Sequence, residues 1–403
     1  MVNPFTGRKG ISEVFYKEIV DYTKLDYNEV KPFNVKNETS KSRQIKRALV
    51  PTAISFAPTT VSAGTGTTIV ISIAGGATGN FGETRGKVSF RNADSGGEDN
   101  GFPDYIDALD TQVTNWTSTS IMVQVPYKAG TGNIRVTDAS QNVVDSSVDL
   151  IVTHAELNVN ATFPIGNETK TYAYPTRLVN NDGSGGYVWQ MESSFDAEEQ
   201  HVGSKADYIA ALDTWRCETG LNFTIGPVTS IDEAALDGVN VIRFDNGSEL
   251  GDGVLGQTSY YFNGCGSSPE NYEVFADEMD MVFDDGESWH FGSGLPGFEI
   301  DFQSVALHEL GHAHQLGHGI EENNDVMHFS IGLAEQIRVL SADNKQGGSN
   351  VQIRNESDTP SCFSGKSAME TYDCNLSVTD QELENAISIY PNPATDIINF
   401  ESE

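Results

Sequence analysis

The chain has 403 residues, too many for one ordinary domain, and this length predicts two or three domains. Acidic residues outnumber basic ones by 58 to 24, which gives a formal net charge of −34. We therefore expect no nucleic-acid partner, because phosphate binding needs clustered Lys and Arg. We also expect no membrane span, because no apolar run approaches the roughly 18 residues that suggest one.

The first part of the chain divides into two segments. Residues 1–47 are polar and mildly basic, which predicts a linker or the remnant of a leader. Residues 48–155 contain short segments in which apolar residues alternate with others, as at Ile69, Ile71 and Ile73, with Gly, Asn and Ser between the segments. This period of two predicts a small antiparallel β-sandwich.

The order of landmarks within residues 48–155 resembles that of an IPT/TIG immunoglobulin-like domain. The landmarks are Pro51, the turn Pro58-Thr59, the sequence NFG at 80–82, and the sequence NWTSTS at 115–120, which leads into the strand Ile121–Val125. The resemblance implies an all-β immunoglobulin-like sandwich. Domains of this family act as spacers or bind other proteins or glycans, and we expect a spacer here.

Residues 156–356 mix the signals of helices and strands. The expected strands are Tyr187–Gln190, Val239–Phe244, Gln257–Phe262 and Asp280–Phe283. One helix is expected to start at Ser204 as its N-cap and to stop at Gly220, and a second to begin near Phe302 after the cap Asp301. A sheet with two long helices predicts an α+β domain.

The chemistry of the chain is predicted by the sequence HELGHAHQLGH at residues 308–318. His308 and His312, four residues apart, share one helix face and can bind one zinc ion. Glu309 is the next residue, so its carboxylate can reach water on the open side of the metal and act as the general base. His318 follows after a turn and completes three neutral histidines, which leave the fourth zinc position open, as in catalytic sites.

Other interpretations of this sequence are less favoured. Histidines can lie on a polar helix face without a metal, but four of the eight histidines fall within these eleven residues around a suitably placed glutamate. On a continuing helix His314 would project about 160° away from His312 and miss the ion. Another zinc class uses a later glutamate as third ligand, but Glu321, Glu322 and Glu335 are not at its usual spacing.

Residues 156–356 resemble the matrixin branch of the metzincin metalloproteases. These enzymes have the motif H-E-x-x-H-x-x-G-x-x-H followed by a methionine turn beneath the zinc. Met327 matches that methionine, and the sequence LSAD at 340–343 resembles the start of their last helix. The resemblance implies a metzincin-type fold, a catalytic zinc on the three histidines, and Gln257–Phe262 as the edge strand that pairs with an extended substrate.

A calcium site is implied in the acidic segment 251–300, which contains ten carboxylates and no Lys or Arg. The sequence FDDGESW at 283–289 is similar to the matrixin segment whose first Asp and later Glu bind calcium. The resemblance therefore implies Asp284 and Glu287 as calcium ligands. Oxygen ligands suit calcium, and a solvated acidic loop is the alternative.

The chain also departs from the family pattern. Gln315 stands where the family has Gly, so either Gln315 accepts a strained conformation or the turn moves to Gly317. The matrixin structural-zinc histidines have no counterparts at 251–289, so we expect no second zinc. Phe329 replaces the tyrosine of the astacin methionine turn, and no cysteine precedes Cys217 to provide a thiol-based latency switch.

The C-terminal part of the chain predicts disulfides and secretion. The four cysteines are Cys217, Cys265, Cys362 and Cys374, an even number that fits two disulfides in an oxidising compartment. The spacing of Cys362 and Cys374 suggests a local clasp within a linker at 357–386. The tail 387–403 begins with ISIYPNPATDI, which resembles the opening of the sorting domain used by the type IX secretion system.

Together these features predict a secreted zinc endopeptidase, expected to be a monomer, that cleaves proteins or peptides. One alternative is a cell-surface adhesin whose sandwich binds and whose catalytic domain is degenerate. The intact Glu309 argues against it, since a decayed enzyme commonly loses its base first. A zinc hydrolase that acts on non-peptide amides is a third possibility that the motif alone does not exclude.

Overall fold

The computed structural model describes residues 50–374, except Ser248, Glu321, Glu322 and Ser364. It also describes the backbone of four short strands nearer the termini, which are β1 (Lys9–Gly10), β2 (Phe15–Glu18), β24 (Ile387–Tyr390) and β25 (Asn399–Ser402). The rest of the predicted N-terminal linker and of the sorting-domain resemblance lies outside the described residues. Within the described part, no helix is long and apolar enough to cross a membrane.

Residues 50–155 form two β-sheets that share one hydrophobic core. The strand orders are β10-β11-β5-β3 and β4-β13-β12-β6-β9. Their bounds are β3 Ile54–Ala57, β4 Thr60–Ala63, β5 Thr68–Ile73, β6 Lys87–Asn92, β9 Tyr105–Asp107, β10 Val113–Trp116, β11 Ser120–Gln124, β12 Ala129–Thr137 and β13 Val143–Ala155, with η2 (Ala93–Ser95), β7 (Glu98–Asp99) and β8 (Phe102–Pro103) between β6 and β9.

The alternation of residues seen in the sequence determines which side chains face the core of this sandwich. Ile69 and Ile71 on β5 are fully buried, whereas Val70 between them is exposed. The prediction of a purely antiparallel arrangement is wrong in one place, because β4 and β13 pair in parallel. The IPT/TIG resemblance itself stays a prediction.

The second region is built on a mixed sheet in the order β14-β15-β20-β18-β16-β17, with β19 antiparallel to β20. The strands are β14 Asn158–Ile165, β15 Glu168–Arg177, β16 Tyr187–Met191, β17 Phe223–Ile225, β18 Asn240–Phe244, β19 Gly256–Cys265 and β20 Glu273–Phe283. The other edge of β19 pairs in parallel with the backbone of β2. Short elements complete the region: η3 Pro269–Asn271, β21 Trp289–His290, β22 Ile300–Asp301 and β23 Ser330–Ile331.

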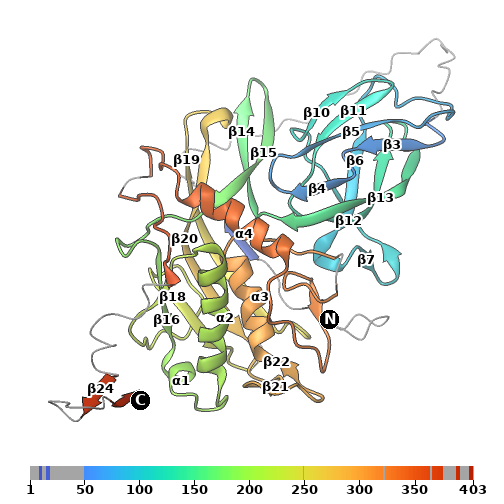
Figure 1. Ribbon diagram of the computed structural model, residues 1–403. Helices are drawn as coiled ribbons and strands as arrows, with labels where there is room; N and C mark the ends of the chain where they lie inside the picture. Colours follow the sequence, from blue (N-terminus) through green and yellow to red (C-terminus); the bar gives the residue numbers. More distant parts are fainter. Residues whose placement is uncertain are drawn as a thin grey trace.

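The helices of this region are α1 (Ser193–Asp196), α2 (Ser204–Thr219), α3 (Phe302–Ala313) and α4 (Ala342–Asn355). α2 and α3 lie side by side, and α4 contacts both α2 and the sandwich strand β13 (Figure 1). α2 ends at Gly220 (φ 77°) as predicted, but its N-cap is Gly203 rather than Ser204. Large apolar side chains such as Trp215 and Phe302 fill the core under these helices.

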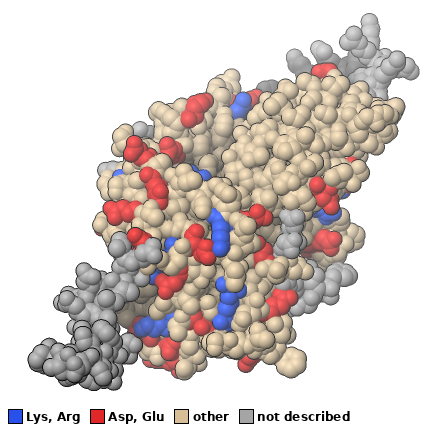
Figure 2. Space-filling model, in the orientation of Figure 1, with Lys and Arg blue, Asp and Glu red and all other residues tan. Residues whose placement is uncertain are grey.

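The surface displays the acidic excess of the sequence. On the face shown in Figure 2, Asp and Glu side chains are spread widely and Lys and Arg are fewer and scattered. This face therefore offers phosphate groups no cluster of basic side chains.

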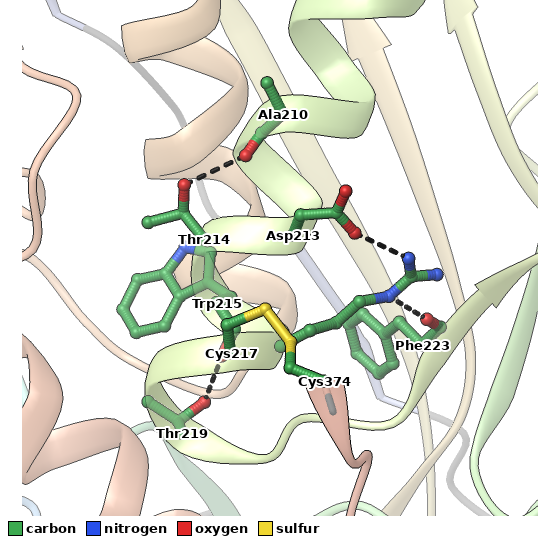
Figure 3. The surroundings of a disulfide bond; sticks show 9 residues. Ala210, Asp213, Thr214, Trp215, Cys217, Thr219, Phe223 and Cys374 are labelled. Carbon is green, nitrogen blue, oxygen red and sulfur yellow. Dashed lines mark hydrogen bonds and ion pairs between the residues drawn. A yellow bond between two sulfur atoms is a disulfide. The ribbon is translucent and has the colours of Figure 1, made fainter. Parts of the chain in front are cut away.

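The predicted clasp between Cys362 and Cys374 is wrong. Cys374 is bonded to Cys217 on α2, and Cys362 is bonded to Cys265 on β19. Figure 3 shows the first of these bonds beside Trp215 in the last turns of α2. The segment that follows α4 is therefore fastened to this second region at two places and is not a linker with a disulfide of its own.

Candidate metal centre and active site

Helix α3 carries the first two predicted metal ligands. The Asp301 side chain caps the helix as predicted, since its Oδ2 accepts a hydrogen bond from the backbone N–H of Ser304 at 3.1 Å. Nearly every residue of α3 is buried. His308 and His312 are one turn apart on one face, and their ring centroids are 4.5 Å apart.

The chain reverses direction directly after α3, at Gln315. Its φ of 69° lies in the left-handed region that favours glycine. Its N–H donates to the His312 carbonyl at 2.7 Å, and the N–H of Leu316 donates to the Gly311 carbonyl at 3.0 Å. These two bonds form a Schellman motif. Of the two expected routes the chain takes the strained one, and Gly317 has no positive φ.

This turn brings His318 to His308 and His312. One ring nitrogen of each histidine lies within 4.8 Å of the other two, and the Nε2 atoms of His312 and His318 are 3.1 Å apart. In every ring Nδ1 contacts an oxygen. The acceptors are the Val326 carbonyl at 2.6 Å, the Leu316 carbonyl at 2.8 Å and the Asp94 carboxylate at 2.9 Å. A proton on Nδ1 leaves Nε2 as the metal-binding nitrogen of each ring.

Burial favours the neutral form of the His308 and His312 imidazoles. Desolvation lowers the pKa of His308 well below its usual value, and the charges of His312 and His318 lower it further. Desolvation and then the charge of His318 lower the pKa of His312 to about 3. Neutral imidazole is the form that binds a metal ion, so these two rings are ready for one at neutral pH.

Glu309 is fully buried next to the histidines. Its Oε2 accepts a hydrogen bond from the Thr258 hydroxyl on β19 at 2.8 Å, while Oε1 is buried without a hydrogen-bond partner among the described residues. Gly256 leaves room for this carboxylate, because a Cβ there would lie 3.0 Å from Oε1. Burial raises the pKa of Glu309 well above its usual value, against the opposing hydrogen bonds of Thr258.

Met327 packs directly against α3. A Cβ at Gly311 would lie 2.2 Å from the Met327 sulfur, so glycine is needed for this close contact. The N–H of Gly319, which follows the third histidine, donates to the Met327 carbonyl at 2.8 Å. Phe329, where astacins have tyrosine, lies against Gly96 of the sandwich. The methionine turn thus supports the loop that holds His318.

The alternative ligands lie elsewhere or outside the described residues. His314 Nε2 lies 3.0 Å from the Thr219 hydroxyl, and its ring meets Trp215 edge to face. Glu335 accepts a hydrogen bond from the N–H of Gly332 at 2.8 Å and is not in the metal-binding group. Glu321 and Glu322 lie outside the described residues.

Of the two predicted calcium ligands, one belongs to a group of clustered carboxylates. Asp284 belongs to a group with Asp245 and Asp285 in which one carboxylate oxygen of each lies within 4.8 Å of the others. Glu287 is not in this group, and its Oε1 accepts a hydrogen bond from the N–H of Ser288. Partial burial, then the hydrogen bond and charge of Asp245, raise the pKa of Asp285. Three carboxylate oxygens that lie this close together repel one another, and such a group suits a divalent cation.

Sequence reasoning missed three residues of these sites. Thr258 holds Glu309, Asp94 contacts His318, and Asp245 joins the acidic group. Asp94 lies 224 residues before its partner, so no local spacing could reveal it. Thr258 lies within the strand predicted as Gln257–Phe262, and its place in that strand was the only available signal.

Comparison with known proteins bears on this arrangement of three histidines and a glutamate. Residues 188–351 match the matrixin family model. This matrixin segment starts in β16, contains α2, α3 and the three histidines, and ends in α4.

The similarity to individual relatives covers shorter stretches than the match to the family model. The chain is similar to human matrix metalloproteinase-25, at 36% identity over 100 residues, which are 23% of this chain and 17% of the relative. Metalloendoproteinase 2-MMP of Arabidopsis thaliana is 30% identical over 145 residues, which are 36% of this chain and 35% of the relative. The chain thus spans about a third or less of the length of these relatives, and the family match is confined to residues 188–351 of a chain that also contains the sandwich.

Proposed function

We propose that this protein is an extracellular zinc endopeptidase. The observation that carries the proposal is the convergence of three buried histidine nitrogens beside Glu309, whose Oε1 has no hydrogen-bond partner among the described residues. The match of residues 188–351 to the matrixins supports a metalloprotease. The complete histidine set and the intact Glu309 argue against the adhesin alternative.

The residues fit zinc. His308, His312 and His318 provide the three-nitrogen set of a catalytic site with an open fourth position. An oxygen acceptor at each Nδ1 orients each ring, as outer-shell partners of zinc ligands do. Zinc held there would polarise the scissile carbonyl and lower the pKa of a water molecule towards about 7.

Glu309 is the general base in this proposal. Its Oε1 accepts the proton of the attacking water, while Thr258 holds Oε2 in place. The same carboxyl group then delivers the proton to the leaving amine. Burial raises the pKa of Glu309, and a cation bound to the neighbouring histidines would favour the ionised carboxylate that accepts this proton. Water attacks directly, so no covalent acyl-enzyme is needed.

The proposed substrate is an extended segment of a protein, bound along β19. Gly256 and Thr258 of this strand both contact Glu309, so a peptide paired with β19 would pass the base. In the structure the backbone of β2 pairs with residues 259–262 at that edge. A substrate strand on the same edge would have to replace β2.

Two further features belong to this proposal. Calcium would bind at Asp245, Asp284 and Asp285 and stabilise the loop after β20. The two disulfides support an oxidising, extracellular location. The resemblance of residues 387–397 to a sorting domain supports export by type IX secretion.

The identity of the third ligand provides a direct test. We expect His318→Ala to lose zinc during dialysis against a weak chelator and to lose casein cleavage. His314→Ala is the matched control and should keep both, because its ring faces Thr219 and Trp215. Metal content per chain is measured by atomic emission. Zinc loss from His314→Ala with retention in His318→Ala would refute the assignment.

A further inference from the structure

The β-sandwich reaches the metal centre through η2, the short turn that contains Asp94. Asp94 Oδ1 lies 2.9 Å from Nδ1 of His318, and its other oxygen, Oδ2, lies 2.7 Å from the Lys128 ammonium of the same sandwich. His308 and His312 are held instead by backbone carbonyls of the protease region itself. Among the described contacts, His318 is thus the one histidine of the three whose Nδ1 acceptor lies in the sandwich.

The sandwich fixes the position of Asp94. The Asn92 side chain accepts a hydrogen bond from the Asp94 N–H at 3.2 Å and so caps η2. Asn92 and Ser95 both donate to one oxygen of Asp104, at 2.8 and 2.7 Å. These bonds hold the turn on both sides of Asp94, so its carboxylate is presented by a folded scaffold and not by a free loop.

The sandwich and the protease region are in close contact around His318. A Cβ at Gly96 would lie 2.3 Å from the Phe329 ring, and a Cβ at Gly130 would lie 2.7 Å from the Ile320 side chain. Gly317 donates its N–H to the Ala155 carbonyl at 2.8 Å. Backbone hydrogen bonds and glycine contacts therefore place the sandwich against the loop on both sides of the third histidine.

We propose that Asp94 is a positioning residue for the zinc site, supplied by the sandwich to His318. A carboxylate that accepts the Nδ1 proton fixes the ring orientation, keeps Nε2 free for the metal and increases its basicity. The sandwich is then part of the metal centre and not a spacer. This inference rests on the proposed zinc peptidase function.

Zinc affinity of the full chain, measured by competition with a chromophoric chelator, tests this role. Asp94→Ala should bind zinc 10–100-fold more weakly, the usual cost of losing an outer-shell partner. Asp94→Asn keeps an oxygen acceptor and should retain more of the affinity than Asp94→Ala. Asp107→Ala is the matched control, because Asp107 is paired with Lys87 on the same sandwich, and its zinc affinity should equal that of the wild type.

The melting temperature without zinc separates positioning from a purely structural contact. If Asp94 only joined the two regions, Asp94→Ala would melt earlier but bind zinc as tightly as the wild type, and the inference would be overturned while the peptidase proposal stood. If the wild-type chain bound no zinc, both proposals would fail. Weaker zinc binding by Asp94→Ala, with an unchanged Asp107→Ala control, would support the inference.

Discussion

Gln315 shows how a single residue can carry backbone strain so that a ligand reaches the metal. It is fully buried, has a φ of 69°, and its Oε1 has no hydrogen-bond partner among the described residues. A side chain in the left-handed conformation costs about 1–2 kcal/mol relative to glycine. This strained conformation forms the turn that lets His318 face His312.

Replacing Gln315 with Gly or with Ala separates the strain from the loss of the side chain. Both variants remove the buried amide and its contacts, but only Gln315→Gly removes the Cβ that causes the strain. We expect Gln315→Gly to be more stable than Gln315→Ala by about 1 kcal/mol, measured by urea unfolding of the zinc-loaded proteins. Equal stabilities would show that the backbone at this position is not strained.

At the scale of elements, the loop after β20 is where the acidic residues gather. Asp284 and Asp285 follow that strand, and Asp245 follows β18, its parallel neighbour in the sheet. The carboxyl ends of the two strands therefore place three carboxylates together. Their repulsion is lowered when a cation binds between them.

Calcium should therefore stabilise the folded protein. A ligand that binds only the folded state adds about 2.7 kcal/mol at a concentration of 100 times Kd, so the melting temperature should rise with millimolar calcium. The rise should shrink in Asp284→Asn and persist in Glu287→Gln, because Glu287 lies outside the group. Equal shifts in the wild type and in Asp284→Asn would assign the effect to general charge screening.

The sequence predicted those elements and residues that depend on local spacing. Asp301 caps α3 and Gly220 ends α2, because capping needs only the residues next to the helix end. His308 and His312 come together because they are one helical turn apart. The disulfide pairing was predicted wrongly, since cysteine spacing along the chain does not record how the chain folds back on α2 and β19.

At the scale of the whole molecule, the sandwich and the protease region share a junction around Glu156. Glu156 is 1% exposed and is paired with Arg354 of α4 at 2.7 Å. The residue after it, Leu157, donates its N–H to the Gln315 carbonyl at 2.9 Å. The chain therefore passes from one region to the other directly beside the strained turn at Gln315. Because residues of both regions contact this turn, we expect its conformation to depend on the folding of both.

The two regions should consequently unfold together. We expect hydrogen exchange of the zinc-loaded protein, followed by mass spectrometry across a urea series, to expose amides of β12 and α3 at the same denaturant concentration. Shared backbone bonds such as that of Gly317 to Ala155 are lost when either region opens. Exchange of β12 at lower urea, with α3 still protected, would show that the sandwich is an independent spacer.

We propose that Glu309 acts on water beside a zinc ion held by histidines alone. Zinc content and casein cleavage of Glu309→Ala test it most directly, with Glu299→Ala as the control, because Glu299 is paired with His290 away from the three ligands. We predict about one zinc per chain in Glu309→Ala and a fall in turnover of at least 10²–10⁴-fold, roughly the contribution of general-base catalysis. A zinc-loaded Glu309→Ala protein that cleaved casein at a near-normal rate would contradict the account.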